Sequence, residues 1–267
     1  MAIYIDLEKE YGNWINNFYD MLFDEEFSKE DYQRCDEIKL KNMPNFLYQY
    51  TKVKHAKDLL KDNIMFLRPF NKLNDPFDGN FIHNLELYIE NGMMIGVDKN
   101  YKEKYQVVCF SEKNDIVPMW TFYADDHKGI CVEYNFLQSQ IFSSFCFPVK
   151  YVDKTDNNLI IKKILNDENF SRRLDFELFL KKSQSWSHEK EWRMIFNDFS
   201  NFKRFHIFEK DDKKYIHFLK PTSVYLGIDI KPKHRESIKN LCRLKKINVY
   251  QMMKDITGYN LIPMQIL

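Results

Sequence analysis

Three charged residues at alternate positions, Glu189, Glu191 and Arg193, are the residues whose spacing points most directly to chemistry. A strand over residues 186–196 would place all three on one face, because strand side chains alternate with a period of two. Two carboxylates on one face repel, and such pairs are typical of sites where a cation, a ligand or a shifted pKa makes use of them. A helix would instead leave Glu189 and Arg193 as a solvated i,i+4 pair, worth about 0.2–0.5 kcal/mol. The tryptophans and the serine-rich run before them favour the strand.

A loop over residues 71–79 is a second candidate element. It contains Asn74 and Asp75, a proline that forces the preceding residue into an extended conformation, and an Asp-Gly turn. Such a loop is rigid, so it suits a binding site as well as it suits a purely structural turn.

A buried strand and a short helix supply further polar and aromatic side chains. Residues 107–111 form an apolar run that ends on the hydroxyl of Ser111. Residues 118–124 begin with a proline and place Trp120 and Tyr123 on one helical face. We expect these side chains near the glutamates.

The polar turn after this helix raises the question of a metal. Asp125, Asp126 and His127 could bind a divalent cation together with Glu189 and Glu191. Three adjacent polar residues in a turn are more often solvated, so we assign no metal ligand.

Composition excludes several common classes of protein. The chain has 267 residues and only seven glycines, with no GxGxxG, GxxxxGK[ST], HExxH or GxSxG motif, so neither a Rossmann nor a P-loop phosphate site is expected. Five cysteines without a CxxC pair predict neither a disulfide framework nor a zinc ribbon. No leader-like start and no apolar run of about 20 residues is present, so we expect a cytoplasmic protein that does not enter a membrane.

Charge is distributed unevenly along the chain. Residues 1–44 carry five basic and eleven acidic side chains, whereas the whole chain has a net charge of +1. This acidic segment could screen a basic cleft, dock a partner, or form a solvated helical appendage. Seven lysines and arginines in residues 231–246 could follow the phosphates of a nucleic acid, although a solvated helix face explains them as well.

The pattern of apolar residues predicts an α+β fold. Helices are expected within residues 1–44 and over 55–61, 84–95, 118–124, 157–182 and 232–245. Strands are expected over 46–51, 64–67, 106–110, 130–134 and 186–196, near 206 and 216, and over 224–230 and 247–251. Because no regular βαβ repeat is present, we predict a helical appendage at 1–44 and one α+β domain at 45–267.

Four ordered motifs carry a resemblance to a known family. They are an LYxYT opening at 47–51, an NDPFDG loop at 74–79, a CFSE…MWxxYADxHxG block at 109–129 and a WxxExEWR block at 186–193. With these motifs the sequence resembles a widespread bacterial family of domains of unknown function. The resemblance extends over residues 45–251 and leaves the acidic N-terminal segment outside.

The order of these motifs is similar to the three-part site of ADP-ribosyltransferases. The similarity implies a split sheet with Tyr48 or Tyr50 on the first strand, Ser111 ending a middle strand, and Glu191 or Glu189 as the late glutamate. The chain departs from that pattern because no His or Arg stands on the first strand, residues 46–51.

This similarity implies NAD as a substrate and a macromolecular acceptor, either protein or nucleic acid. Glu191 would stabilise the positive charge that develops on the ribose, and Glu189 would position the acceptor or pair with Arg193. Arg193 or Arg68 would meet the pyrophosphate. Residues expected around the nicotinamide and the rest of NAD are Tyr48, Tyr50, Asn74, Asp75, Trp120, Tyr123 and Arg193. Toxin and phage-defence roles are common for such transferases, so an antitoxin or a regulatory partner is also implied.

Two other functions stay open from the sequence. A magnesium-dependent nuclease would use Asp75 or Asp78 with Glu189 and Glu191, although no lysine stands two residues after either glutamate. A non-catalytic module that binds nucleic acid or nucleotides would leave the charged stretch with a structural role.

Overall fold

The structure is a computed structural model, and it describes residues 14–22, 29–79, 101–153, 178–197 and 205–267. The helix predicted over 84–95 lies outside these residues, as does most of the one predicted over 157–182. The last two positions of the latter, Lys181 and Lys182, belong to a strand. No helix in the part of the chain that is described is long and apolar enough to cross a bilayer.

Two N-terminal helices confirm the helical prediction for the described part of residues 1–44. They are α2 (Trp14–Leu22) and α3 (Lys29–Asn42). Phe18 and Tyr19 of α2 are buried, and the Tyr19 hydroxyl donates a hydrogen bond to the carbonyl of Pro148. Lys39 of α3, also buried, donates to the carbonyl of Ser144 at 2.6 Å. Both helices therefore pack against the body of the protein through apolar side chains and buried hydrogen bonds.

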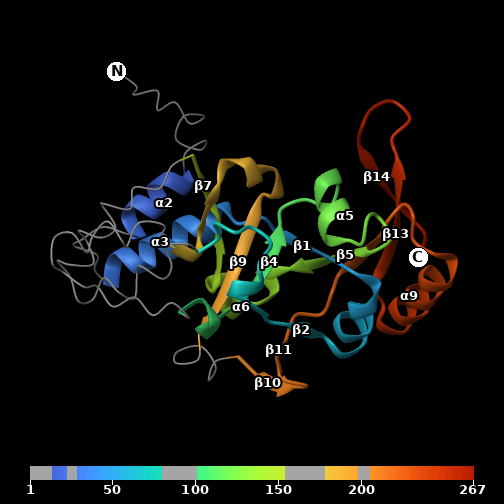
Figure 1. Ribbon diagram of the computed structural model, residues 1–267, viewed down its shortest axis with the longest axis horizontal. Helices are drawn as coiled ribbons and strands as arrows, with labels where there is room; N and C mark the ends of the chain where they lie inside the picture. Colours follow the sequence, from blue (N-terminus) through green and yellow to red (C-terminus); the bar gives the residue numbers. More distant parts are fainter. Residues whose placement is uncertain (1–13, 23–28, 80–100, 154–177, 198–204) are drawn as a thin grey trace.

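A mixed, largely antiparallel sheet forms the centre of the molecule (Figure 1). Its order is β14 (Leu261–Gln265), β13 (Asn248–Lys254), β12 (Ser223–Leu226), β5 (Ile130–Asn135), β1 (Phe46–Thr51), β4 (Tyr105–Ser111), β9 (Glu191–Asn197) and β6 (Cys146–Pro148). Only the β12–β13 pair of this path is parallel among the described strands. The α+β prediction is thus confirmed, and β14 and β6 are strands that sequence patterns did not predict.

The sheet opens between β1 and β4. Strand β1 pairs with β5 along its full length, and β4 pairs with β9 along its full length. In contrast, β1 and β4 are in register only at Tyr48 and Ser111. At the other end of β4, the short strand β3 (Arg68–Pro69) pairs with Val107 and Gln106. A stretch of each strand edge between these points is left without a sheet neighbour among the described residues, and the candidate site lies there.

Smaller elements close the opening and the ends of the sheet. A helical turn runs from Val53–His55 to Asp58–Asp62 and ends at Asn63, whose φ of 53° is left-handed. Strand β2 (Ile64–Phe66) follows and joins β11 (Lys213–His217), which pairs with β10 (Ile207–Lys210). A second small sheet pairs β7 (Lys150–Val152) with β8 (Lys181–Ser183).

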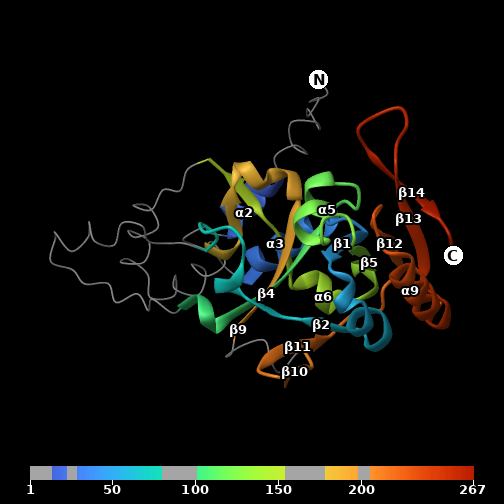
Figure 2. The same cartoon turned by 45° about the vertical axis from the view of Figure 1, so that its right-hand side comes forward.

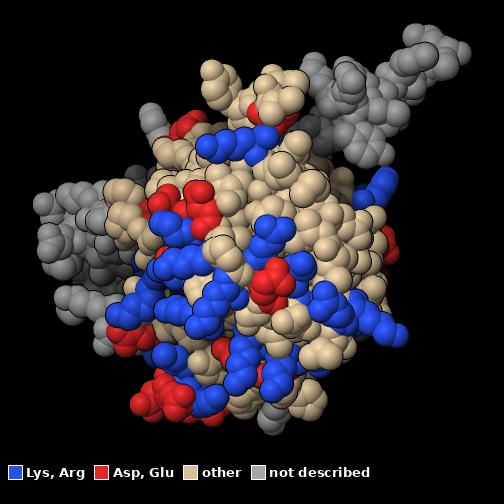
Figure 3. Space-filling view, turned by 90° about the vertical axis from the view of Figure 1, so that its right-hand side faces the viewer, with Lys and Arg blue, Asp and Glu red and all other residues tan. Residues whose placement is uncertain are grey.

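Helices cover both faces of the central sheet. On one face, Met119 and Trp120 of α5 (Val117–Tyr123) pack with Tyr50 of β1 and Tyr225 of β12. On the other, Ile238 and Cys242 of α9 (Pro232–Lys245) join the main core. Figure 2 shows α9 beside β13 and close to the helical turn at 53–62. Figure 3 shows that lysines and arginines gather on the side of the molecule that carries α9.

The charged stretch differs from its prediction in one respect. A 3-10 helix covers Gln184–Glu189, Lys190 is left-handed with a φ of 46°, and only then does β9 begin, at Glu191. The predicted strand over 186–196 is therefore wrong in its first half. Serines that can cap a helical turn explain the difference, because the Ser183 hydroxyl accepts a hydrogen bond from the backbone N–H of Ser185.

Candidate active site

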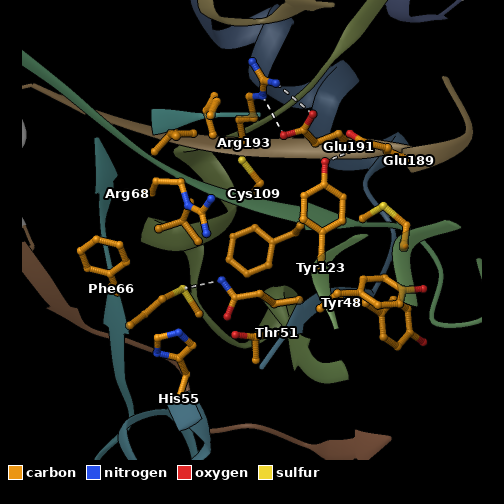
Figure 4. Close-up of a pocket in the computed structure, with 18 of the residues that line it drawn as sticks. Tyr48, Thr51, His55, Phe66, Arg68, Cys109, Tyr123, Glu189, Glu191 and Arg193 are labelled. Carbon is orange, nitrogen blue, oxygen red and sulfur yellow. Dashed lines mark hydrogen bonds and ion pairs between the residues drawn. The ribbon is translucent and has the colours of Figure 1, made fainter. Parts of the chain in front are cut away.

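A cavity of about 140 Å³ lies in the opening between β1 and β4. Strand β2 and the helical turn at 53–62 line it on one side, and α5 contributes Met119 and Tyr123. Figure 4 shows Glu189, Glu191 and Arg193 at one end of the cavity and His55 toward the opposite end. Arg68, Phe66 and Tyr123 lie between these two ends.

Arg193 is the most completely bonded residue at the charged end. Its Nε and Nη2 donate to the two carboxylate oxygens of Glu191 at 2.8 and 2.9 Å. Its Nη1 and Nη2 donate to the two oxygens of Asp78 at 2.7 and 2.6 Å, and Nη1 also donates to the carbonyl of Phe179 at 2.7 Å. A guanidinium has five N–H groups, so every donor of this fully buried side chain is used. Arg193 therefore fixes Glu191 and the loop that carries Asp78.

Lys182 is the second buried cation of the site. Its ammonium lies 2.5 Å from Oε2 of Glu189, 3.0 Å from Oε2 of Glu191 and 4.0 Å from Oδ2 of Asp78. Burial alone would lower the pKa of Lys182, but Glu191 and Glu189 raise it above its usual range. The repulsion expected between the two glutamates is thus relieved by a lysine of the same chain.

Glu189 reaches the cavity with fewer partners than Glu191. Besides Lys182, it accepts a hydrogen bond from the Tyr123 hydroxyl at 2.6 Å, and that hydroxyl accepts one from the side-chain amide of Asn74 at 2.9 Å. Burial, followed by the charge of Glu191, raises the pKa of Glu189 despite Lys182. The Tyr123 hydroxyl holds one carboxylate oxygen in place, and the side chain is only 2% exposed.

Glu191 has the opposite electrostatics. Burial alone would raise its pKa, but Arg193 and then Lys182 hold the pKa of Glu191 well below its usual range. Glu191 is therefore ionised at neutral pH. The cluster contains three carboxylates, Asp78, Glu189 and Glu191, and two cations, Arg193 and Lys182. With all five groups ionised, it carries one net negative charge.

The three residues that the motif order singles out are cross-strand neighbours. Tyr48 faces Ser111 in the register of β1 and β4, and Ser111 faces Glu191 in the register of β4 and β9. Tyr48 and Glu191 line the cavity. Ser111 is fully buried beside it, and its hydroxyl donates to the backbone carbonyl of Glu189 at 2.6 Å. Ser111 therefore positions the segment that carries Glu189 and does not open onto the cavity.

The predicted NAD-binding residues divide into two groups. Tyr50, Asn74 and Tyr123 line the cavity as expected. Trp120 does not line it, because the ring packs edge-on against Tyr50 in the core, with its Nε1 donating to the carbonyl of Asn114. Asp75 does not line it either, since its Oδ1 accepts the backbone N–H of Phe77 and shapes the loop.

Arg193 also departs from its predicted role. It pairs with Glu191 and Asp78, and with no donor left it cannot meet a pyrophosphate. Glu189 pairs with Lys182 and accepts from Tyr123. The predicted alternative, in which Glu189 pairs with Arg193, is therefore wrong. Arg68, the other predicted phosphate ligand, lines the cavity and is exposed.

Three cavity residues were not identified from the sequence as members of a transferase site. Lys182 opens the serine-rich run before the glutamates, and the need of two carboxylates for a cation was the signal that could have found it. Asp78 was considered only as a metal ligand. His55 lines the far end of the cavity, where burial lowers its pKa. No sequence spacing connected His55 with the other site residues.

A family model described as "protein of unknown function (DUF2971)" matches residues 119–194, from within α5 to within β9. The matched span includes Tyr123, Lys182, Glu189, Glu191 and Arg193, which form most of the charged end of the cavity. The resemblance to a family of unknown function thus holds over this span, and the motifs at 47–51 and 74–79 lie outside it. No curated protein and no solved structure matches the chain.

Proposed function

We propose that this protein is an ADP-ribosyltransferase-like enzyme that binds NAD with the nicotinamide ring in the cavity and transfers ADP-ribose to a macromolecule. One observation carries the proposal. The central sheet opens between β1 and β4 at the Tyr48–Ser111 pair, and the cavity in that opening brings Tyr48 together with Glu189 and Glu191. A split sheet with an aromatic residue and a late glutamate at the opening is the arrangement that the motif order implies.

The size of the cavity supports a single ring as its occupant. An apolar cavity of about 150 Å³ holds one benzene molecule. The present cavity, about 140 Å³, therefore suits nicotinamide, while the ribose and the rest of NAD would extend toward solvent. Tyr48, Tyr50 and Tyr123 line the cavity, and an aromatic face attracts the cationic nicotinamide of NAD.

The charge of the cavity supports bond cleavage at the ribose. Positive charge develops on the sugar as nicotinamide leaves, and a negative charge held nearby stabilises that state. The cluster as a whole carries one negative charge in excess, and Glu189 is the one of its three carboxylates that does not bind Arg193, because Asp78 and Glu191 both accept from that guanidinium. We accordingly assign the stabilising role to Glu189. Glu191 keeps Lys182 and Arg193 in place, which reverses the roles expected from motif order.

The wall of the cavity between its two ends suits the phosphates of NAD. Arg68 is exposed there and can offer two parallel N–H groups to a pyrophosphate. This supports Arg68 as the ligand of the pyrophosphate, a role that Arg193 cannot take because all of its donors are used.

The nuclease alternative receives less support. Its carboxylates Asp78, Glu189 and Glu191 do meet, but Lys182 and Arg193 occupy the positions between them that a cation would need. Within the described ranges, no set of three or more His, Cys, Asp or Glu side chains is arranged to hold a metal ion.

The test is nicotinamide release from NAD, measured by chromatography with full-length protein. Glu189→Gln should reduce kcat/KM by about 100-fold, because it removes the charge that stabilises the transition state. The matched control is Glu133→Gln. Glu133 is also a buried glutamate with hydroxyl donors, Tyr225 and Thr222, but it does not line the cavity, so its loss should leave the rate within a few-fold. No release by the wild-type protein, or equal losses in both variants, would contradict the proposal.

A further inference from the structure

Two segments far apart in sequence form one basic surface, called here the basic face. The first is the helical turn with its flanks, residues 52–62, and the second is α9 with its flanks, residues 231–246. Its cations are Lys52, Lys54, Lys57, Lys61, Lys231, Lys233, Arg235, Lys239, Arg243, Lys245 and Lys246. Figures 1 and 2 both place the two segments next to each other, and Figure 3 shows the resulting concentration of positive charge.

Acidic side chains neutralise little of the positive charge on the basic face. The same two segments contain only three acidic residues, Asp58, Asp62 and Glu236, against the eleven cations. Lys239 pairs with Glu236 at 3.6 Å and Lys52 with Asp125 at 3.8 Å. The other nine cations form no ion pair with a described residue. A surface with this excess attracts a polyanion.

The basic face adjoins the cavity. His55, Asp58 and Leu59 line the cavity, while Lys54 and Lys57 of the same helical turn are exposed on the basic face. One short segment thus contributes to both surfaces. A polyanion bound along the basic face would pass the end of the cavity where His55 lies.

We propose that the basic face binds the phosphate backbone of a nucleic acid, and that this nucleic acid is the acceptor of the transferase. The acceptor role rests on the proposed function, whereas binding does not. Successive cations Arg235, Lys239 and Arg243 are one helical turn apart, about 6 Å, and alternate phosphates of one strand rise about 6.8 Å.

The composition of the basic face favours nucleic acid over a protein partner. Protein interfaces are centred on buried aromatic and aliphatic anchors. On α9 the one large hydrophobic side chain that is strongly exposed is Leu244, whereas Lys233 and Arg243 are exposed cations of the same helix. Backbone phosphates need cations and few apolar contacts, which matches this surface.

The test is fluorescence anisotropy with the full-length protein and a labelled single-stranded 20-mer, titrated over a series of salt concentrations without NAD. Two double variants address the two segments, Lys233→Glu/Arg243→Glu on α9 and Lys54→Glu/Lys57→Glu on the helical turn. Arg34→Glu, an exposed position on α3 at the other side of the molecule, is the control. All five side chains are at the surface, so circular dichroism should show unchanged folding.

Each double variant should weaken binding by at least tenfold and make the salt slope shallower by about 1.4, the value for two lost phosphate contacts. The control should bind like the wild type. If the wild type binds polyglutamate as tightly as the 20-mer, or if the variants bind like the control, the inference is overturned. Nicotinamide release is measured separately on the same variants. A protein that binds the 20-mer but releases no nicotinamide would refute the proposed transferase while leaving the binding surface in place.

Discussion

The two glutamates of the cavity should lose very different amounts of stability on the same substitution. Glu191 accepts hydrogen bonds from Nε and Nη2 of Arg193 and from Nζ of Lys182, at 2.8, 2.9 and 3.0 Å. Glu191→Gln places an amide N–H₂ against one of these cations and leaves both with less negative charge nearby. Removing one partner of a buried ion pair costs about 3–5 kcal/mol, so we expect a loss of this size in the free energy of unfolding.

Glu189→Gln should cost about 1 kcal/mol or less. The pKa of Glu189 is raised by burial and by Glu191, so the folded protein disfavours its ionised form. A glutamine can still accept from Lys182 through its oxygen, and Lys182 keeps Glu191 as its counter-ion. The substitution therefore removes an unfavourable buried charge at Glu189 together with a favourable ion pair to Lys182.

Urea unfolding at pH 7, followed by tryptophan fluorescence, measures both free energies. The m-values of the two variants should match that of the wild type, so that the midpoints alone report stability. Glu133→Gln serves again as the control for loss of a buried carboxylate outside the cavity. If Glu189→Gln loses as much stability as Glu191→Gln, the division of roles between the two glutamates is refuted.

Two further predictions concern the charged cluster, and a third concerns the turn at Gly227. Lys182→Met should lower the free energy of unfolding by about 3–5 kcal/mol, and adding Glu189→Gln should recover part of the loss, which a double-mutant cycle measures. The pKa of Glu191 is depressed in the folded state, so the ionised carboxylate stabilises the folded protein at pH values above 4.5, its ordinary pKa. This stabilisation is lost as the pH falls below 4.5. Urea midpoints should therefore drop on acidification less steeply for Glu191→Gln than for the wild type. Gly227→Ala should lower the melting temperature by several degrees, because a Cβ there would overlap the carbonyl of His127; an unchanged melting temperature would argue against this close approach.

Periodicity predicted the regular elements of the fold well. Strand β1 and helix α9 have the bounds that the apolar pattern indicates, and α5, β4 and β5 differ from prediction by one residue at one or both ends. These segments bury a face or a stripe of apolar side chains, so local pattern and tertiary structure agree. The pattern failed at residues 184–189, where serine hydroxyls compete for backbone N–H groups and favour a helical turn.

The site was predictable where residues of neighbouring strands or of one sequence motif meet. Tyr48, Ser111 and Glu191 are brought together by strand pairing, which motif order anticipates. Lys182 and Asp78 reach the cavity from a short strand and a loop, and no periodicity reports how such segments fold back. The five hydrogen bonds of Arg193 likewise depend on contacts with Asp78, which is distant in the sequence. The sequence alone therefore could not predict that Arg193 acts as an internal counter-ion.

A crystal structure of the full-length protein soaked with NAD tests the central claim most directly. We predict that the nicotinamide ring occupies the cavity between β1 and β4, that the adjoining ribose faces Glu189, and that the pyrophosphate meets Arg68. Density for NAD at any other position, or a nicotinamide ring turned away from Glu189 toward solvent, would contradict the account.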